Sequence, residues 1–387
     1  MTPPRDTATP TAPSTSGSTA TASTSAPAAV STAGRDDDYA EFAAELDALY
    51  AEVMAARGPD DERYLRRLIA LQRRLDLGGR LTLTVATVTP FGPLAWLAGA
   101  GMLGVAKILD NMEIGHNILH GQWDWLDDPD ISSRTWEWDH ACPAEQWKHL
   151  HNELHHEWTN VRGRDRDIGY GAVRIDPERP WRTADLANPV IYATLPFWFD
   201  YAISVHDIEE LSLKRMGDSD LGAAGPKLRQ TARKIGKLVR KDYVAWPLLA
   251  APFGLGAVAA AAAGGLAANT IRNVWTFVVI FNGHFPDGVD IFDEDEVEHE
   301  SRGHWYRRQV QGSANFSGGK LLHVMSGHLG FQIEHHCFPD MPSNHLRRIA
   351  PRVREICDRH DVKYNVASLP RQAASVARRI MRLSFPD

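Results

Sequence analysis

Cysteine and excess positive charge are both scarce in this chain of 387 residues. The three cysteines, Cys142, Cys337 and Cys357, are too few and too irregularly spaced for a disulfide framework or a zinc knuckle, and they fit a reducing compartment. The formal net charge of −7 argues against a nucleic-acid-binding protein, which normally carries a basic surface. The amino-terminal region also lacks the basic start and apolar core of a secretory signal, so we expect no cleaved export sequence.

Composition divides the chain into four regions. Residues 1–38 are rich in Thr, Ser, Ala and Pro, a composition that buries too little apolar surface to fold, and we expect a disordered tail. Residues 39–80 carry apolar side chains at helical spacing with charges between them, which predicts amphipathic helices. Residues 81–350 contain the long apolar runs and are expected to form a membrane domain, and residues 351–387 a basic cytoplasmic segment.

Two runs without charged residues are long enough to enter a membrane. Residues 81–106 hold no charge over 26 positions and residues 244–271 none over 28, whereas one span needs roughly 20 residues. We expect two helical hairpins, the first of short or tilted helices broken near Pro90 and the second turning at Gly264–Gly265. The spans of the second hairpin are then expected at about 244–263 and 266–283. The expected fold is all-α: an integral-membrane helical bundle of about four transmembrane helices under a cytoplasmic helical cap.

The orientation follows from the basic segments. Residues 214–241 carry nine Lys and Arg against two Asp, and residues 343–387 carry ten against four acids. Short basic loops face the cytoplasm, so we expect both termini and the cap on that side. The apolar stretch at 186–205 contains two prolines and an aspartate, and we expect an interfacial or re-entrant element there. The mean hydropathy of −0.32 keeps one alternative open, a soluble enzyme with two Ala-rich core hairpins.

Histidine is concentrated in a few short segments. Three clusters and one single residue hold the candidates: His116 and His120 in HNILH, His151, His155 and His156 in HNELHH, Gln332, His335 and His336 in QIEHH, and His284 in FNGHFPDG. Residues three or four apart share one helix face, so each cluster can direct its imidazoles to one place. Imidazole suits iron, zinc, copper and nickel. Eight histidines exceed the three or four protein ligands of one zinc ion, and their number indicates two metals.

The longer phrases around these clusters carry a resemblance. NMEIGHNILHGQWDWLDDPDI, QWKHLHNELHHEWTNVRGRDRDIGYG, NGHFPDG and QIEHHCFPDMPS resemble the membrane fatty acid desaturase family, in particular actinobacterial acyl-CoA desaturases, over roughly residues 80–350. The resemblance implies a di-iron site in the cytoplasmic cap, with two iron ions as cofactor. It also implies the iron ligands, which are His116, His120, His151, His155, His156, His284, His335 and His336, with Gln332 as a further candidate.

Three features bear on this resemblance. Gln332 stands where many members of the family have histidine, and QIEHH with glutamine at this position resembles the front-end desaturases. His328 adds a spare donor close to the third cluster. The His-Pro-Gly-Gly motif of a fused cytochrome b5 domain does not occur, so we expect a separate electron donor such as a ferredoxin, a flavoprotein reductase or a cytochrome b5-like protein.

The activity implied is insertion of a cis double bond into a fatty-acyl chain carried by coenzyme A or by a lipid of the bilayer. Removing two hydrogens from unactivated methylenes needs a strong oxidant. O2 accepts four electrons on its way to two waters, of which the substrate supplies two and the donor supplies two. The protein contributes ligation, positioning and exclusion of water, and we expect no catalytic side chain beyond the metal centre.

Several residues near the clusters are candidates for supporting roles. Carboxylates can accept the second N–H of a ligand imidazole, and the candidates for this role are Glu113, Asp165, Asp167 and Glu334, with ordinary surface acids as the alternative. Five tryptophans can line an acyl tunnel or mark the membrane interface: Trp123, Trp125, Trp136, Trp138 and Trp158. We expect His206 to be structural.

Two other functions stay open at this stage. A hydroxylase or other monooxygenase acting on lipids or terpenoids would use the same clusters, and only its product differs. A non-catalytic membrane protein that binds or transports metal belongs to a different class and would place its ligands along a path inside the spans, whereas these histidines follow the predicted spans in sequence.

Overall fold

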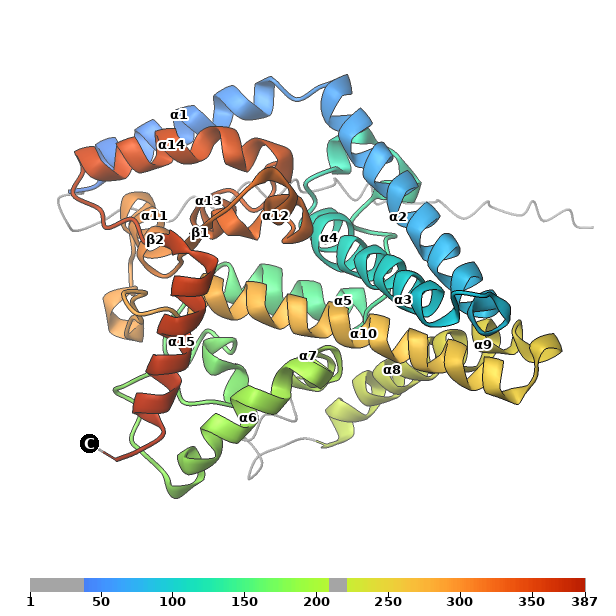
Figure 1. Ribbon diagram of the computed structural model, residues 1–387. Coiled ribbons are helices and arrows are strands. Elements are labelled where there is room, and N and C mark those ends of the chain that lie inside the picture. Colours follow the sequence, from blue (N-terminus) through green and yellow to red (C-terminus); the bar gives the residue numbers. More distant parts are fainter. Residues whose placement is uncertain (1–37, 209–220, 387) are drawn as a thin grey trace, which may run out of the picture.

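The computed structural model describes residues 38–208 and 221–386. Residues 1–37 of the expected tail and residues 214–220 of the basic segment lie outside the described residues. The described chain is mainly helical, which agrees with the predicted all-α class (Figure 1). Its only strands in these ranges, β1 (Asn315–Ser317) and β2 (Val366–Ser368), form one short parallel pair.

The helices fall into an amino-terminal, a central and a carboxy-terminal set. The first set is α1 (Ala40–Ala55), α2 (Pro59–Val85), α3 (Gly92–Ile108), α4 (Asn117–Leu119) and α5 (Ala144–Trp147). The central set is α6 (Asn188–Thr194), α7 (Phe199–His206), α8 (Leu221–Arg240), α9 (Trp246–Leu248) and α10 (Leu255–His284). The last set is α11 (Arg302–Gln311), α12 (Lys320–Met325), α13 (Gln332–Cys337), α14 (Ser343–Arg359) and α15 (Leu369–Leu383).

Helix α10 crosses the middle of the molecule and connects its two halves (Figure 1). Its first half is rich in Ala and Gly and packs against α2 and α3, where Leu83 and Leu103 are buried. Its second half carries Phe277 and Phe281, which pack with α7 and α15. Because α10 ends at His284, the helix joins the apolar half of the molecule to the half that holds the histidines.

The predicted turn at Gly264–Gly265 is wrong, because α10 continues through both glycines. Each glycine instead allows a close approach: a Cβ on Gly264 would lie 2.3 Å from Leu83, and one on Gly265 would lie 3.1 Å from the Asp242 carbonyl oxygen. The chain turns earlier, at a 3₁₀ turn over Ala251–Phe253, where Gly254 takes the left-handed φ of 97°. The spans expected at 244–263 and 266–283 therefore do not form as two separate helices.

The first apolar run does break where predicted. Helix α2 ends at Val85 and α3 starts at Gly92, with Pro90 in the connection. Helix α2 begins at Pro59, however, so the amphipathic region and the start of the apolar run form one helix across residue 80.

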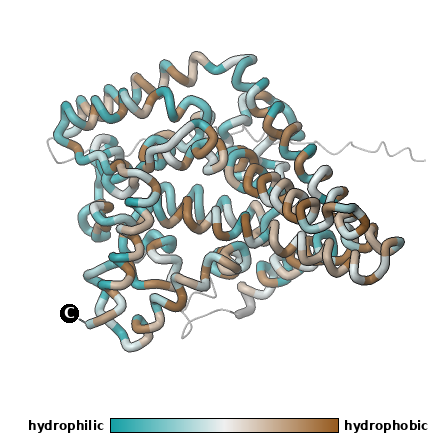
Figure 2. Tube along the Cα trace, in the orientation of Figure 1, coloured by the Kyte–Doolittle hydropathy of each residue, from teal (hydrophilic) through white to brown (hydrophobic). Residues whose placement is uncertain are grey.

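Exposed apolar side chains gather where α2, α3, α9 and α10 turn. This end of the molecule contains Phe91, Leu94 and Leu255, which are 71%, 65% and 86% exposed. In Figure 2 many of its segments are brown, at the right of the view. Within the described residues one helical stretch, Gly92–Leu119, is long and apolar enough to be a candidate membrane span, although a buried core helix can meet the same criteria. The expected bundle of four spans stays a prediction.

The opposite side of the molecule is a helical cap. Helices α1 and α14 lie side by side there (Figure 1) and bury Phe42, Leu46 and Val53 against Leu346 and Val353. The stretch expected to be interfacial or re-entrant forms two short helices, α6 and α7, joined by a 3₁₀ turn. Val190, Phe197 and Trp198 remain more than half exposed in this part of the chain.

Candidate metal centre

The histidine clusters lie on four elements that meet below the cap. His116 ends a π-helix at Leu109–His116 that continues α3, and His155 ends a second π-helix at Lys148–His155. His284 is the last residue of α10, and α13 carries the third cluster. The sequence predicted ordinary helical spacing for all clusters and missed both π-helices, whose wider turns are frequent at functional sites.

The structure brings seven of the eight predicted histidines into two groups that consist of histidine alone, and a third group, His151, His155 and Asp167, overlaps both. In each group the candidate ligand atoms lie within 4.8 Å of one another. The first group is His116, His120, His151 and His335, and the second is His155, His284 and His336. Each group draws on at least three of the chain segments, so only the folded chain assembles it. Each could hold a metal ion.

His156 and Gln332 complete the arrangement. The His156 ring lies between the groups, with its centroid 4.6 Å from that of His120 and 4.3 Å from that of His336. The Gln332 side-chain nitrogen lies 2.9 Å from Nε2 of His284, so the glutamine borders the second group. All nine predicted site residues therefore lie at one place.

Many ring nitrogens of these histidines have no hydrogen-bond partner, as expected for metal ligands. Buried polar atoms are nearly always hydrogen-bonded, and exceptions indicate a missing ion or water. Several buried ring nitrogens here have no protein partner: Nε2 of His120, His151 and His336, Nδ1 of His284, and both nitrogens of His156 and His335. Such a concentration of unpaired acceptors in the described chain is the donor set that a transition metal requires.

Burial prepares most of these imidazoles for ligation. It holds the pKa of His156, His335 and His336 well below the usual value, and the neighbouring histidines lower it further. The rings are therefore neutral and keep a lone pair for a metal. His155 differs: burial alone would lower its pKa, but the Asp165 carboxylate outweighs burial and raises it.

Two of the predicted supporting carboxylates contact the histidines. Asp165 accepts a hydrogen bond from Nδ1 of His155 at 3.0 Å, which leaves Nε2 to face the second group. Asp167 lies 3.9 Å from Nδ1 of both His151 and His155 and pairs with Nε2 of His206 at 3.0 Å. His206, expected to be structural, thus holds a carboxylate of the site in place.

The sequence did not predict three further side chains that contact ring nitrogens of the histidines. Oδ1 of Asn117 lies 3.0 Å from Nδ1 of His116, while the Thr159 hydroxyl and the Gln309 side-chain oxygen lie 3.0 and 3.1 Å from Nδ1 of His336. Asn117 and Thr159 follow ligand candidates by one and three residues, a spacing that could have indicated them. Gln309 comes from α11 and gives no such signal.

The two other carboxylate candidates, Glu113 and Glu334, have partners outside the two groups. Glu113 accepts hydrogen bonds from Tyr64 and Ser343 and pairs with His328 at 2.9 Å, so it orients none of the eight histidines. His328 is engaged by that carboxylate and belongs to neither group. Glu334 is bonded to Tyr364 and Asn315.

An apolar cavity lies against both groups. Its wall includes His116 and His151 of the first group and His284 of the second. The rest of the wall is mainly apolar, with Trp138, Trp147 and Tyr170 among its aromatic residues. Of the five tryptophans predicted for a tunnel, Trp138 alone lines this cavity, and Trp147 takes part without having been predicted. The Trp147 ring stacks on His151 with centroids 4.4 Å apart.

The geometry thus defines a helical protein with two adjoining imidazole groups, each suited to a metal ion, beside an apolar chamber. The sequence profile of the fatty acid desaturase family matches residues 81–368. An NADPH-dependent stearoyl-CoA 9-desaturase of Mycobacterium tuberculosis is 44% identical over 352 residues, which cover 91% of this chain and 81% of the relative. This chain belongs to the fatty acid desaturase family. It is an oxidoreductase that desaturates fatty-acyl chains.

More distant relatives share the activity class. An acyl-lipid 8-desaturase of Rebecca salina is 27% identical over 70% of this chain and 60% of the relative. An sn-1 linoleoyl-lipid 6-desaturase of Arthrospira platensis is 26% identical over 72% of this chain and 76% of the relative. The names of these relatives differ in the position of the double bond and in the carrier of the acyl chain.

Proposed function

We propose that this chain is a di-iron desaturase that inserts a cis double bond at position 9 of a saturated long-chain acyl-CoA. The observation that carries the proposal is the apolar cavity whose wall includes His116, His151 and His284, because these residues belong to both imidazole groups. The acyl chain, carrier and position follow the stearoyl-CoA 9-desaturase that is 44% identical.

The two groups give the proposed distribution of ligands. His116, His120, His151 and His335 hold one iron, and His155, His284 and His336 hold the other. His156, with both nitrogens unpartnered, lies between the two sites and completes one of them through a single ring nitrogen. Gln332 completes the second site through its side-chain oxygen, which has no partner among the described residues.

O2 activation and hydrogen abstraction are chemistry that the iron pair supplies when bound. The chain's own residues position the reactants. Asp165, Asn117 and the Thr159–Gln309 pair each fix one ring nitrogen of a ligand and thereby orient the other toward the metal. The apolar wall of Met112, Ile203, Ile280 and Leu329 holds methylenes next to the imidazoles and keeps water away from the reacting carbons.

Two electrons per double bond come from a separate donor protein. The relative is named NADPH-dependent, which supports a reductase that draws on NADPH. His151 is the member of the first group with the most exposed side chain, at 16%, and the Lys148–His155 helix covers the site at the surface, so we propose that electrons enter there.

The membrane arrangement is proposed from the apolar end of the molecule. The tips of the α2–α3 and α9–α10 hairpins, with Phe91 and Leu255 exposed, enter the bilayer as four short helical segments. The histidines and both termini then face the cytoplasm, as the basic segments also indicate.

The test is expression in a desaturase-free host together with a ferredoxin and its NADPH reductase, followed by mass spectrometry of the fatty acid methyl esters. We expect a new monoene whose double bond maps to position 9. An alcohol or epoxide without any alkene would establish a monooxygenase, and an unchanged lipid profile with bound metal would favour a metal-binding protein.

Two matched histidine variants connect the activity to the site. His155→Ala removes a ligand candidate of the second group. We expect this variant to lose about half of the bound iron and to form no monoene. His149→Ala, six residues earlier on the same helix, removes a side chain that is 47% exposed and bonded to Glu153, and both readouts should stay at the wild-type level.

A further inference from the structure

Three elements contribute residues to the lining of the cavity beside the histidines. Each contributes three, counting one residue directly after α7. On α10 these are His284, Ile280 and Thr276, which are spaced by four residues and so share one helix face. Thr276 is the first residue of α10 that lines the cavity.

The two other elements carry the rest of this set. On the continuation of α3, the lining residues are His116 of the first group, Met112 and Asn111. On α7, which packs against α10, the lining residues are Ile203 and Phe199, and Asp207 directly follows this helix. The Phe199 ring packs against that of Phe277, which follows Thr276, with centroids 5.4 Å apart, so Phe199 lies at the far end.

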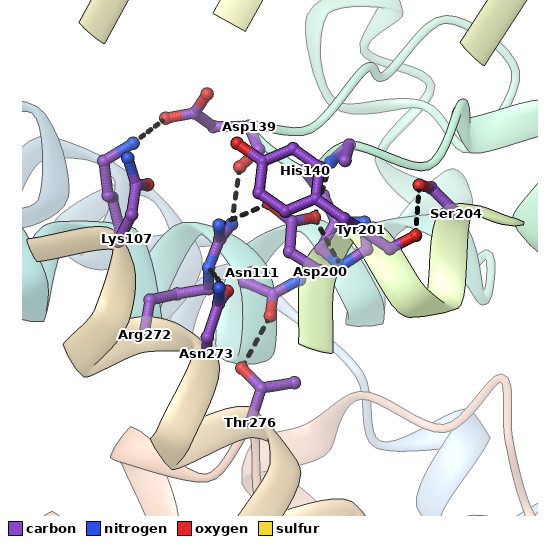
Figure 3. A network of polar contacts seen from close by, with 12 residues as sticks. Lys107, Asn111, Asp139, His140, Asp200, Tyr201, Ser204, Arg272, Asn273 and Thr276 are labelled. Atoms are coloured by element: carbon purple, nitrogen blue, oxygen red, sulfur yellow. Dashed lines mark hydrogen bonds and ion pairs between the residues drawn. The ribbon is translucent and has the colours of Figure 1, made fainter. Parts of the chain in front are cut away.

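A hydrogen bond closes the far end. The Thr276 hydroxyl donates to Oδ1 of Asn111 at 2.9 Å and thereby bridges α10 and the continuation of α3 (Figure 3). Both side chains are buried. His140, another residue of the wall, lies beside them and pairs with Asp200 at 3.0 Å.

A buried ionic network lies directly behind this bridge (Figure 3). Arg272, one turn before Thr276, pairs with Asp200 at 2.5 Å and donates to the Asp139 carbonyl oxygen at 3.0 Å. Lys107, one turn before Asn111, pairs with Asp139 at 2.9 Å and with Asp242 at 2.8 Å. Beyond the cavity, α10 and α3 therefore carry Arg272 and Lys107, whose charges are paired with aspartates.

Such a network makes a firm end wall. Separating a buried ion pair leaves charges without compensation in a medium of low dielectric, and this costs far more free energy than the burial of one extra methylene gains. A hydrocarbon chain that pressed against this wall would therefore stop at it and would not displace it.

We propose that the Thr276–Asn111 bridge, backed by the Arg272–Asp200 pair, is the stop for the methyl end of the acyl chain and so sets the longest chain that the enzyme accepts. The proposal rests on the proposed function, since it takes the reacting carbons to lie at the histidine end of the cavity. It assigns a specificity-determining role to Thr276 and Asn111.

The dimensions agree with the proposed substrate. His284 lies eight positions after Thr276, which corresponds to about 12 Å along a helix that rises 1.5 Å per residue. An extended hydrocarbon chain with bonds of ~1.5 Å advances about 1.3 Å per carbon atom, so this depth accommodates roughly nine carbons. A stearoyl chain that reacts at position 9, as the relative's name states, has about eight carbons beyond the reacting pair.

The test is a competition assay of the iron-loaded protein with its electron donor and an equimolar mixture of myristoyl-, palmitoyl-, stearoyl- and arachidoyl-CoA. Thr276→Leu adds bulk at the stop, and we expect the yield of stearoyl product relative to myristoyl product to fall about tenfold or more, the usual effect of one methylene too many in a tight pocket. The double bond should stay at the same position from the carboxyl end.

Two variants separate volume from other effects. Thr276→Val keeps the side-chain volume and removes the hydrogen bond. Because the stop acts through the volume of the Thr276 and Asn111 side chains and the charged network behind them, this variant should retain the wild-type preference for chain length. Thr270→Leu makes the same exchange on α10 at a residue that does not line the cavity and bonds to its own helix at Leu266, and it should also leave the preference unchanged. An unchanged product ratio in Thr276→Leu would contradict the proposal that this residue limits chain length. The same shift in Thr270→Leu would contradict it as well.

A binding measurement covers the case in which Thr276→Leu has no activity. The rise in melting temperature on adding each saturated acyl-CoA should grow with chain length up to stearoyl in the wild type and should stop at a shorter chain in Thr276→Leu. Equal plateaus in the two proteins contradict the proposal. Absence of any alkene from the wild type would refute the proposed function instead, so the two failures are distinguishable.

Discussion

At the scale of single residues, the site depends on groups that hold one nitrogen of an imidazole and leave the other free. Asp165 is one such group, and none of its side chain is exposed. Besides the hydrogen bond from His155, it accepts two from the backbone N–H groups of Asn160 and Asp167. Its position is therefore fixed by the loop that follows the second histidine cluster, and it fixes His155 in turn.

Replacing Asp165 by Asn should weaken metal binding without removing a ligand. We expect iron retention against a chelator to fall by about 10- to 100-fold, the usual effect of losing a partner of a metal-bound histidine. The measurement is iron per chain after dialysis against graded chelator concentrations. Glu153→Gln is the control, because Glu153 is an exposed carboxylate that bonds His149 outside both groups, and a loss of the same size there would contradict the role of Asp165.

At the scale of elements, the apolar end is assembled by close contacts between helices. Helices α2 and α3 cross at Gly79 and Gly99, where a Cβ on Gly79 would lie 2.8 Å from the backbone nitrogen of Leu103 and 2.9 Å from the Gly99 carbonyl oxygen. Small residues at such crossings bring helices together where lipid provides no hydrophobic drive. Gly264 plays the same part for α10 against Leu83, which explains why glycines that suggested a turn lie inside a helix.

The neighbouring glycines of α2 give a matched test of this packing. Gly79→Ala should destabilise the protein by about 1–3 kcal/mol, because the added methyl meets backbone atoms that cannot yield without separating the helices. Gly78→Ala, at a position with open space around it, should leave stability unchanged or raise it by up to about 1 kcal/mol through better helix propensity. Thermal unfolding in detergent measures both, and equal effects of the two changes would argue against a close crossing.

At the scale of the whole molecule, ion pairs join segments that are distant in sequence. Arg162, in the loop after the second cluster, binds Asp176 through two nitrogens at 2.8 and 3.2 Å and also binds Asp293. Burial alone would raise the pKa of Asp176, but the hydrogen bonds from Arg162 and from the Glu178 backbone N–H hold it below its usual value. This carboxylate therefore couples folding to pH.

The sign of the coupling follows from the lowered pKa. The stabilisation by Asp176 is complete above the pKa of an unfolded Asp, about 3.9, and it is lost as the pH falls through the lower pKa of the folded state. Asp176→Asn should thus lower the melting temperature at neutral pH and flatten its decline below about pH 4. Glu178→Gln, which changes a 67% exposed carboxylate on the same arginine, should leave that profile unchanged. A wild-type slope in Asp176→Asn would contradict this assignment.

The sequence by itself was enough to select the histidines that the structure brings together and to identify the family. Histidines at spacings of three to five residues can face one way on a helix, and their surrounding phrases identified the family. The break near Pro90 could also be predicted from the sequence, because proline and glycine interrupt a helix locally. These features depend on a few neighbouring residues, so no knowledge of distant contacts was needed.

Only the tertiary structure decided how the histidines divide and what supports them. The division into two groups depends on the meeting of the Leu109–His116 and Lys148–His155 helices with α10 and α13, and so does the hydrogen bond that the Gln309 side-chain oxygen accepts from Nδ1 of His336. The same holds for the continuity of α10 through Gly264–Gly265 and for the Thr276–Asn111 bridge that closes the cavity. Each of these joins residues far apart in the chain, and packing, which no local pattern encodes, selected the partners.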